Sequence, residues 1–145
     1  MCMKISFNRA DRSATLANRV ALKAFIERSV QKEGLAIESL HYIFCSDKFL
    51  LNINKTYLKH NYYTDIISFD LSETKGKLIG EVYISIDRVK DNAKTHKTAL
   101  KEELLRVIFH GALHFCGYKD KKPGDIKKMR FLEEKWMKSY LKSIS

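Results

Sequence analysis

The segment LLRVIFHGALHFCG (104–117) constrains the fold of this chain more than any other. It is apolar almost throughout, which predicts a helix packed inside a domain, and it carries two histidines four residues apart. Because residues at i and i+4 lie on the same side of a helix, His110 and His114 project together and can bind one ion. Gly117 stands where a helix can end in a left-handed conformation, and the reversal there can bring Asp120 back beside both histidines. We therefore expect His110, His114 and Asp120 to be metal ligands.

Two histidines and one carboxylate, with an open position for water, form a recognised kind of catalytic zinc site. A zinc protease also keeps a glutamate directly after its first histidine, where it takes a proton from the metal-bound water. Gly111 occupies that position, so the protease mechanism is absent. Cleavage of a phosphodiester can instead rely on the metal to acidify its water and to neutralise charge on the phosphate. The sequence does not identify the general base, and Glu81, near the end of a predicted strand, is one candidate.

These residues also have alternative explanations in packing and capping. The two histidines could be core residues, and the glycine could allow another backbone to approach the helix. Asp125 is a rival for the third ligand position, although it follows a Pro-Gly pair and could cap the last helix instead. Cys116 is a possible soft ligand, but it points about 160° away from His114 on a helix and is expected in the core.

The remaining pattern predicts four strands and five helices in the order β-α-β-α-β-β-α-α-α. Strands are expected at 4–8, 39–45, 66–71 and 77–86, and Gly76 marks a hairpin turn between the last two. Helices are expected at 14–33, from Ser46 or Asp47 through 58, from Asp87 to about 96, from Thr98 to 116, and from about 123 onward. In the first helix, Leu16, Val20 and Val30 belong to the predicted apolar stripe. The prediction is an α/β (α+β) fold in which residues 1–145 form a single domain: one mixed β-sheet of about four strands with helices packed on it, and the metal site on a central helix.

The composition is that of a small globular protein without disulfides. The chain has 145 residues, of which 45% are hydrophobic and 30% charged, enough for one core. Cys2, Cys45 and Cys116 are odd in number and scattered, which argues against a disulfide framework and favours a reducing cytoplasm. No apolar run approaches the ~18 residues of a membrane span, and charge comes too early for a secretory signal. We expect a cytoplasmic protein with no membrane association.

Basic residues outnumber acidic ones, 27 against 17, which gives a net charge of +10. They concentrate in KTHKTALK (94–101) and KDKKPGDIKKMR (119–130). A surface of one sign attracts polyanions, and nucleic acid is the obvious one, whereas the alternative is a solvated face that keeps the protein soluble. The candidate RNA-binding residues in the second segment are Lys121, Lys122, Lys127 and Lys128.

The metal-binding segment also resembles a known family. HGALHFCGYKD (110–120) resembles the HGxLHLxGYDH motif of the YbeY family, bacterial metal-dependent endoribonucleases that act in ribosomal RNA maturation. LNINKTYL (51–58), YTDIISFD (63–70) and GEVYIS (80–85) resemble the family's LN-xx-YR, pTDVLSF and GDIxIS stretches, in the same order. Met129 and Glu133 fall where the family's last helix has such residues.

The resemblance implies a zinc-dependent, single-strand-specific endoribonuclease that binds one Zn²⁺ ion. It also implies a role in maturation of small-subunit (16S) rRNA and in ribosome biogenesis and quality control. The implied partners are ribosomal RNA and the small ribosomal subunit, with no obligatory protein partner evident.

The sequence departs from the family at two site positions. The family's third metal histidine aligns with Asp120, a conservative exchange because both residue types bind zinc. The family's arginine after the tyrosine of LN-xx-YR aligns with Leu58, which leaves Lys59 as the candidate phosphate-contacting and catalytic cation. Lysine would act as a point charge, without the bidentate fork of arginine.

Two other classes of function remain open. A metallohydrolase of another ester or amide would need a carboxylate from elsewhere to reach the metal-bound water. A non-catalytic RNA-binding ribosome assembly factor would hold a structural zinc, whose fourth protein ligand would leave no position for water.

Overall fold

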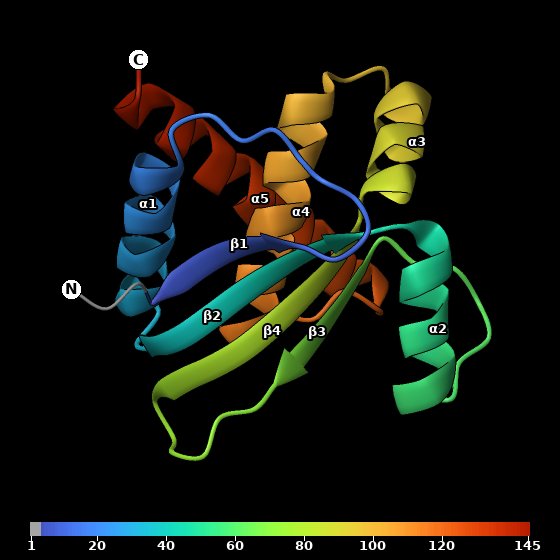
Figure 1. Cartoon of the computed structure of the whole chain (residues 1–145). Coiled ribbons are helices and arrows are strands. Elements are labelled where there is room, and N and C mark those ends of the chain that lie inside the picture. Colours follow the sequence, from blue (N-terminus) through green and yellow to red (C-terminus); the bar gives the residue numbers. More distant parts are fainter. Residues whose placement is uncertain (1–3) are drawn as a thin grey trace.

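The structure is a computed structural model that describes residues 4–145, so Cys2 lies outside the described residues. In this part of the chain, one sheet is covered by five helices (Figure 1). The strands are β1 (Ile5–Arg9), β2 (Ala36–Cys45), β3 (Ile66–Asp70) and β4 (Lys77–Ser85). The helices are α1 (Arg19–Lys32), α2 (Asp47–Tyr57), α3 (Ile86–His96), α4 (Leu100–Phe115) and α5 (Pro123–Ser143).

The four strands lie in the order β1-β2-β4-β3 and form a mixed sheet. β1, β2 and β4 are parallel, while β3 pairs with β4 in the antiparallel sense and forms an edge of the sheet. The predicted mixed sheet of about four strands is therefore confirmed. The predicted turn between β3 and β4 is also confirmed, because Gly76 has φ 85°, a conformation that glycine adopts without strain.

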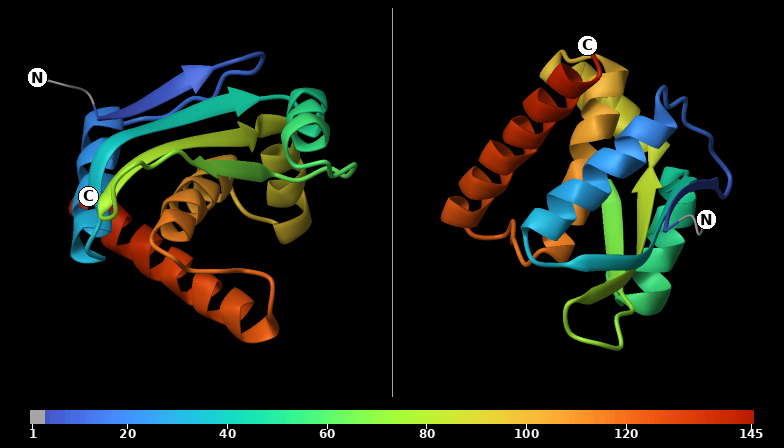
Figure 2. Two further views of the ribbon diagram at one scale, coloured as in Figure 1. Left: turned by 90° about the horizontal axis from the view of Figure 1, so that it is seen from below. Right: turned by 90° about the vertical axis from the view of Figure 1, so that its left-hand side faces the viewer.

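The helices divide between the two faces of the sheet, and this division positions the candidate site. α1, α4 and α5 pack on one face, while α2 covers the other face beside β3 and β4 (Figure 2). The main core is rich in aromatic residues, with Phe25 packed against Phe109, Trp136 and Tyr140. Tyr42 is fully buried in β2 and donates its hydroxyl to the carbonyl of Ile108 at 3.0 Å. This hydrogen bond satisfies a buried polar group and ties α4 to the sheet.

Several helices and strands begin or end at other residues than predicted. Their ends are set by capping side chains and by which residues are buried. Ser46 caps α2 as expected, since its side chain accepts a hydrogen bond from the backbone of Phe49. The cap of α3 is Ser85 rather than Asp87, and the strand before it ends at Ser85. α1 begins only at Arg19, and Val20, placed in the predicted apolar stripe, is 84% exposed. Leu22 takes the buried position of that first turn.

Gly111 lets α4 approach the sheet closely. A Cβ atom on this residue would lie 3.1 Å from Ile66 Cδ1 and 3.1 Å from Val82 Cγ1. The alternative explanation, close approach of another backbone, is therefore corrected: side chains of β3 and β4 pack against Gly111. Packing thus explains why glycine stands where a zinc protease has its glutamate.

Candidate metal centre

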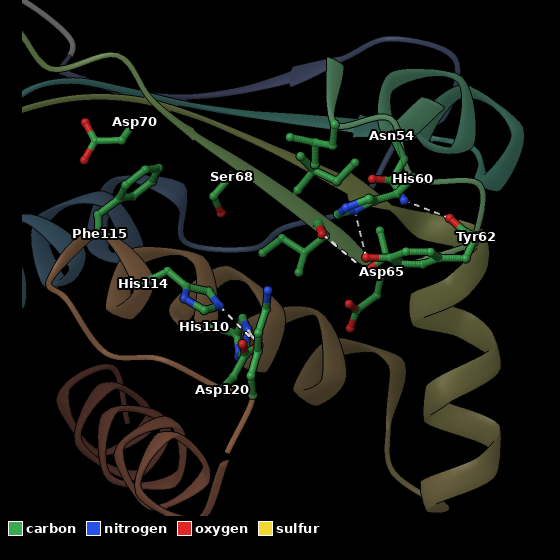
Figure 3. Close-up of a pocket in the computed structure, with 15 residues that line it drawn as sticks. Asn54, His60, Tyr62, Asp65, Ser68, Asp70, His110, His114, Phe115 and Asp120 are labelled. Carbon is green, nitrogen blue, oxygen red and sulfur yellow. Dashed lines mark hydrogen bonds and ion pairs between the residues drawn. The ribbon is translucent and has the colours of Figure 1, made fainter. Parts of the chain in front are cut away.

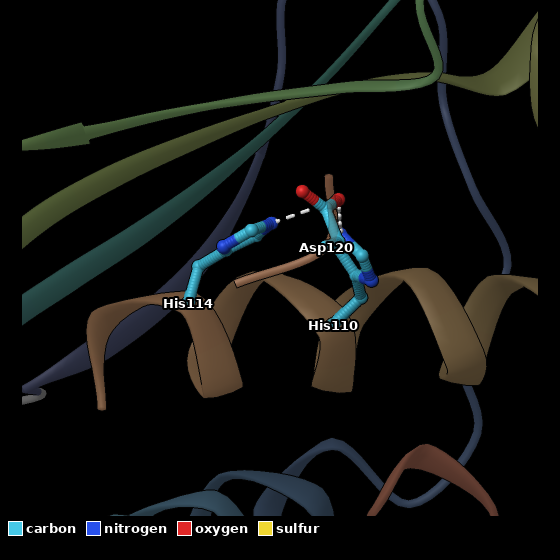
Figure 4. Close-up of side chains that lie close together, drawn as sticks. All are labelled: His110, His114 and Asp120. Carbon is cyan, nitrogen blue, oxygen red and sulfur yellow. Dashed lines mark hydrogen bonds and ion pairs between the residues drawn. The ribbon is translucent and has the colours of Figure 1, made fainter. Parts of the chain in front are cut away.

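His110, His114 and Asp120 come together on one side of α4 (Figure 4). Asp120 Oδ2 lies 3.0 Å from His110 Nε2 and 3.2 Å from His114 Nε2. All three potential ligand atoms lie within 4.8 Å of one another. One nitrogen from each ring and one carboxylate oxygen therefore point to a common position, and this donor set fits a divalent metal ion.

The turn after α4 brings Asp120 back to the helix as the sequence predicts. Gly117 has φ 100°, so the predicted left-handed conformation is confirmed. The backbone N–H of Gly117 donates to the carbonyl of His114, and that of Tyr118 donates to the carbonyl of Leu113. These bonds fix the path of the chain over the end of α4, so Asp120 is held beside the histidines.

A buried carboxylate of α5 orients the first histidine. Glu133, which is 5% exposed, places Oε2 2.6 Å from His110 Nδ1. A proton on Nδ1 satisfies this contact and leaves the lone pair of Nε2 directed at the ligand group. Burial alone would lower the pKa of His110, but the hydrogen bond and charge of Glu133, aided by Asp120 and Asp65, raise the pKa above its usual value.

Arg106 of α4 pairs with acidic side chains of α5, including Glu133. Its guanidinium lies 3.5 Å from Glu133 Oε1 and also pairs with Glu134 and Glu103. One carboxylate oxygen of Glu133 therefore pairs with Arg106, and the other contacts His110. Such pairing is what a buried carboxylate requires.

The three ligands lie at the floor of a cleft of about 620 Å³ (Figure 3). One wall is formed by β3 and the loop that precedes it, and the other by α4 and the turn after it. Asp65 projects from the first wall toward the ligands. Its pKa is raised mainly by burial, partly offset by the nearby His110. The cleft thus holds a half-buried carboxylate besides the three ligands.

Glu81, the base suggested by the sequence, lies outside the cleft, so this suggestion is corrected. Along β4, Val82 faces α4, so Glu81 projects from the opposite face of the sheet, where it lines a groove with Tyr57 and Tyr83. Asp65 is the carboxylate that sequence reasoning missed. Asp65 belongs to the segment YTDIISFD, but only the position of β3, which follows it, places Asp65 in the cleft.

The predicted RNA-binding lysines are distributed unevenly around the cleft. Lys121 lines it, whereas Lys122, Lys127 and Lys128 lie exposed at and after the start of α5. Lys59, the candidate substitute for the family's arginine, is exposed in a left-handed conformation with φ 55°. Leu58 and His60, its neighbours, line the cleft, while Lys59 is absent from the lining.

Two further expectations concern residues beside the site. Asp125, the rival ligand, lies in the first turn of α5 and is not part of the converging group, nor does its side chain cap that helix. Cys45 and Cys116 are both free, and Cys116 packs partly buried against the main core.

Within residues 4–145, no helix combines the length and apolar character that crossing a membrane requires.

The fold and the ligand group together define a class of protein: an α/β domain with a candidate mononuclear metal site built on its buried helix. The family model described as "Endoribonuclease YbeY" matches residues 4–141. The chain belongs to this family.

Similar proteins agree with this assignment. An "Endoribonuclease YbeY" of Cytophaga hutchinsonii is 47% identical over 130 residues, which cover 90% of this chain and 91% of the relative. A protein of the same name from Parabacteroides distasonis is 42% identical over 123 residues, covering 85% of this chain and 86% of the relative. A solution structure of a Thermotoga maritima protein has a TM-score of 0.60 at 22% identity, and the match covers 96% of this chain and 90% of that one. This last similarity shows the shared fold.

Proposed function

We propose that this chain is a zinc-dependent endoribonuclease that cleaves single-stranded RNA during maturation of small-subunit ribosomal RNA. One Zn²⁺ ion would be held by His110, His114 and Asp120. The observation that carries the proposal is the convergence of these three donors at the floor of an open cleft. The name shared by its relatives adds the reaction class and the RNA substrate. Its proposed partners are ribosomal RNA and the small ribosomal subunit, and its proposed compartment is the cytoplasm, where this RNA is processed.

A divalent ion in this site would supply an acidified water and would neutralise charge developing on the phosphate. The chain's own residues supply the remaining requirements. Glu133 keeps the proton of His110 on Nδ1, so that Nε2 stays available. Asp65 is placed to accept a proton through its carboxylate from a group bound in the cleft. Lys121 lies at the rim, where its charge attracts the RNA backbone.

The test combines metal analysis with RNA cleavage. Purified protein should contain about one zinc ion per chain and should cut a single-stranded fragment of small-subunit ribosomal RNA. A chelator should abolish cleavage, added zinc should restore it, and His114→Ala should be inactive at normal folding. Cleavage that survives removal of the metal, or that survives in His114→Ala, would contradict the proposal. A stoichiometric metal without any cleavage would instead favour the assembly-factor function.

A further inference from the structure

The loop that follows α2 places two aromatic side chains on the wall of the cleft. The rings of His60 and Tyr62 are stacked, with centroids 5.2 Å apart and an interplanar angle of 21°. A hydrogen bond of 2.9 Å joins the Tyr62 hydroxyl to His60 Nδ1. Both side chains line the same cleft as the three candidate ligands, at the end where α2 terminates (Figure 3).

Backbone contacts hold this aromatic pair in place. Asn54, which is 1% exposed, donates its side-chain N–H to the carbonyl of Tyr62 at 2.9 Å. Its own carbonyl accepts the N–H of His60 at 3.0 Å. Both residues are therefore anchored to the buried side of α2, so little loop entropy remains to be lost when a ligand binds them.

The pair nevertheless offers a large open surface. Tyr62 is 56% exposed, and within residues 4–145 its ring stacks on that of His60. Elsewhere in this fold, Tyr42 and Tyr140 bury their rings in the core. An exposed aromatic face in a cleft that carries a cation at its rim suits the flat face of a nucleobase, since base stacking requires no particular base identity.

We propose that His60 and Tyr62 form a nucleobase subsite, on which the base of an unpaired nucleotide stacks while its phosphate approaches the ligand group. The inference rests on the proposed function and adds to it the residues that select unpaired RNA. A base within a duplex is covered on both faces by its neighbours, whereas an unpaired base can present one face to this pair. The subsite thus discriminates by strand state rather than by sequence.

The test uses the zinc-loaded protein and single-stranded 2′-O-methyl oligoribonucleotides, which lack the free 2′-hydroxyl. 2-Aminopurine, a base whose fluorescence falls on stacking, replaces one base at a time. At one or more positions, binding should quench the probe. Tyr62→Ala and His60→Ala should remove the quenching and weaken binding by about 5-fold or more, whereas Tyr62→Phe should retain both. Binding to duplex RNA should change little in any of these variants.

Tyr57→Ala is the matched control, because Tyr57 is 70% exposed and lines the groove on the opposite face of the sheet. This variant should bind the oligonucleotides like the unmodified protein. If Tyr62→Ala and His60→Ala fold normally and still quench the probe with unchanged affinity, the subsite is overturned although RNA cleavage stands. If the unmodified protein neither binds nor cleaves RNA, the proposed function fails, and the subsite fails with it.

Discussion

Glu133 Oε2 lies 2.6 Å from His110 Nδ1, and this contact joins α5 to the candidate metal centre on α4. The two residues are 23 positions apart in the chain. Glu133 is buried and paired with Arg106, so its carboxylate is held in one orientation. The geometry of the ligand group therefore depends on how the last helix packs.

Glu133→Ala should weaken metal binding by about 10- to 100-fold, because His110 loses the acceptor that fixes its tautomer and ring orientation. Glu133→Gln should lose less, since an amide oxygen can still accept the N–H. Competition with a chromophoric chelator measures the affinity. Glu134→Ala is the control: this residue also pairs with Arg106 but is half-exposed and does not contact His110. Equal affinities in Glu133→Ala and the unmodified protein would refute the orienting role.

Asp120→Ala should lose most metal affinity, because two histidines alone hold zinc poorly. Asp120→His should keep the metal, and its pH–rate profile should move to lower pH. The reason is that loss of one carboxylate makes the metal more electrophilic and its water more acidic. Asp125→Ala, which alters the rival carboxylate, should leave metal content unchanged. Full metal occupancy in Asp120→Ala, measured by elemental analysis, would remove Asp120 from the ligand set.

Gly111→Glu should unfold or strongly destabilise the protein and should not create a protease. Even the first added carbon would lie 3.1 Å from Ile66 and from Val82, and Val82 is fully buried. Gly111→Ala should be far milder, because overpacking of about 1–3 kcal/mol is partly offset by about 1 kcal/mol of helix propensity. Gly124→Ala is the control, since a Cβ atom there would have no atom of residues 4–145 beyond its local chain within 4 Å. Thermal unfolding that leaves Gly111→Glu as stable as the unmodified protein would contradict the packing role.

Lys121→Glu should weaken RNA binding more than reversal of any lysine outside the cleft, because Lys121 lines it. Loss of one phosphate contact should lower the slope of log affinity against log salt by about 0.7. Reversing Lys122, Lys127 and Lys128 together should weaken binding to many RNA sequences alike. Lys138→Glu, exposed farther along α5, serves as the control. Salt-independent RNA binding would favour the alternative, in which these lysines form a solvated face that keeps the protein soluble and do not contact RNA.

The fold was largely predictable because its signals are local. The order of strands and helices, the hairpin turn at Gly76 and the left-handed end of α4 at Gly117 all follow from short-range patterns. Predictions at the surface of an element were less accurate. Val20 fitted an apolar stripe, yet it is exposed, because the buried face of α1 carries Leu22, Phe25, Ile26 and Val30. On a helix, Val20 lies about 160° around the axis from Leu22.

The sequence by itself determined the core of the candidate site. His110 and His114 meet because they are one helical turn apart, and Asp120 returns because Gly117 permits a tight reversal. Local geometry thus brings the three side chains together, while the contact with Glu133 on α5 orients the ring of His110.

Only the tertiary structure decided what surrounds that core. Strand register sends Glu81 to the far face of the sheet, whereas the path into β3 brings Asp65 into the cleft. Packing of α5 brings Glu133 to His110, and the anchoring of the loop by Asn54 turns Tyr62 toward the same cleft. Glu133 and His110 are 23 positions apart, and the Asn54–Tyr62 hydrogen bond spans an irregular loop, so no local periodicity encodes these relationships. They exist because burial of the apolar faces of α4, α5 and the sheet fixes where each polar side chain emerges.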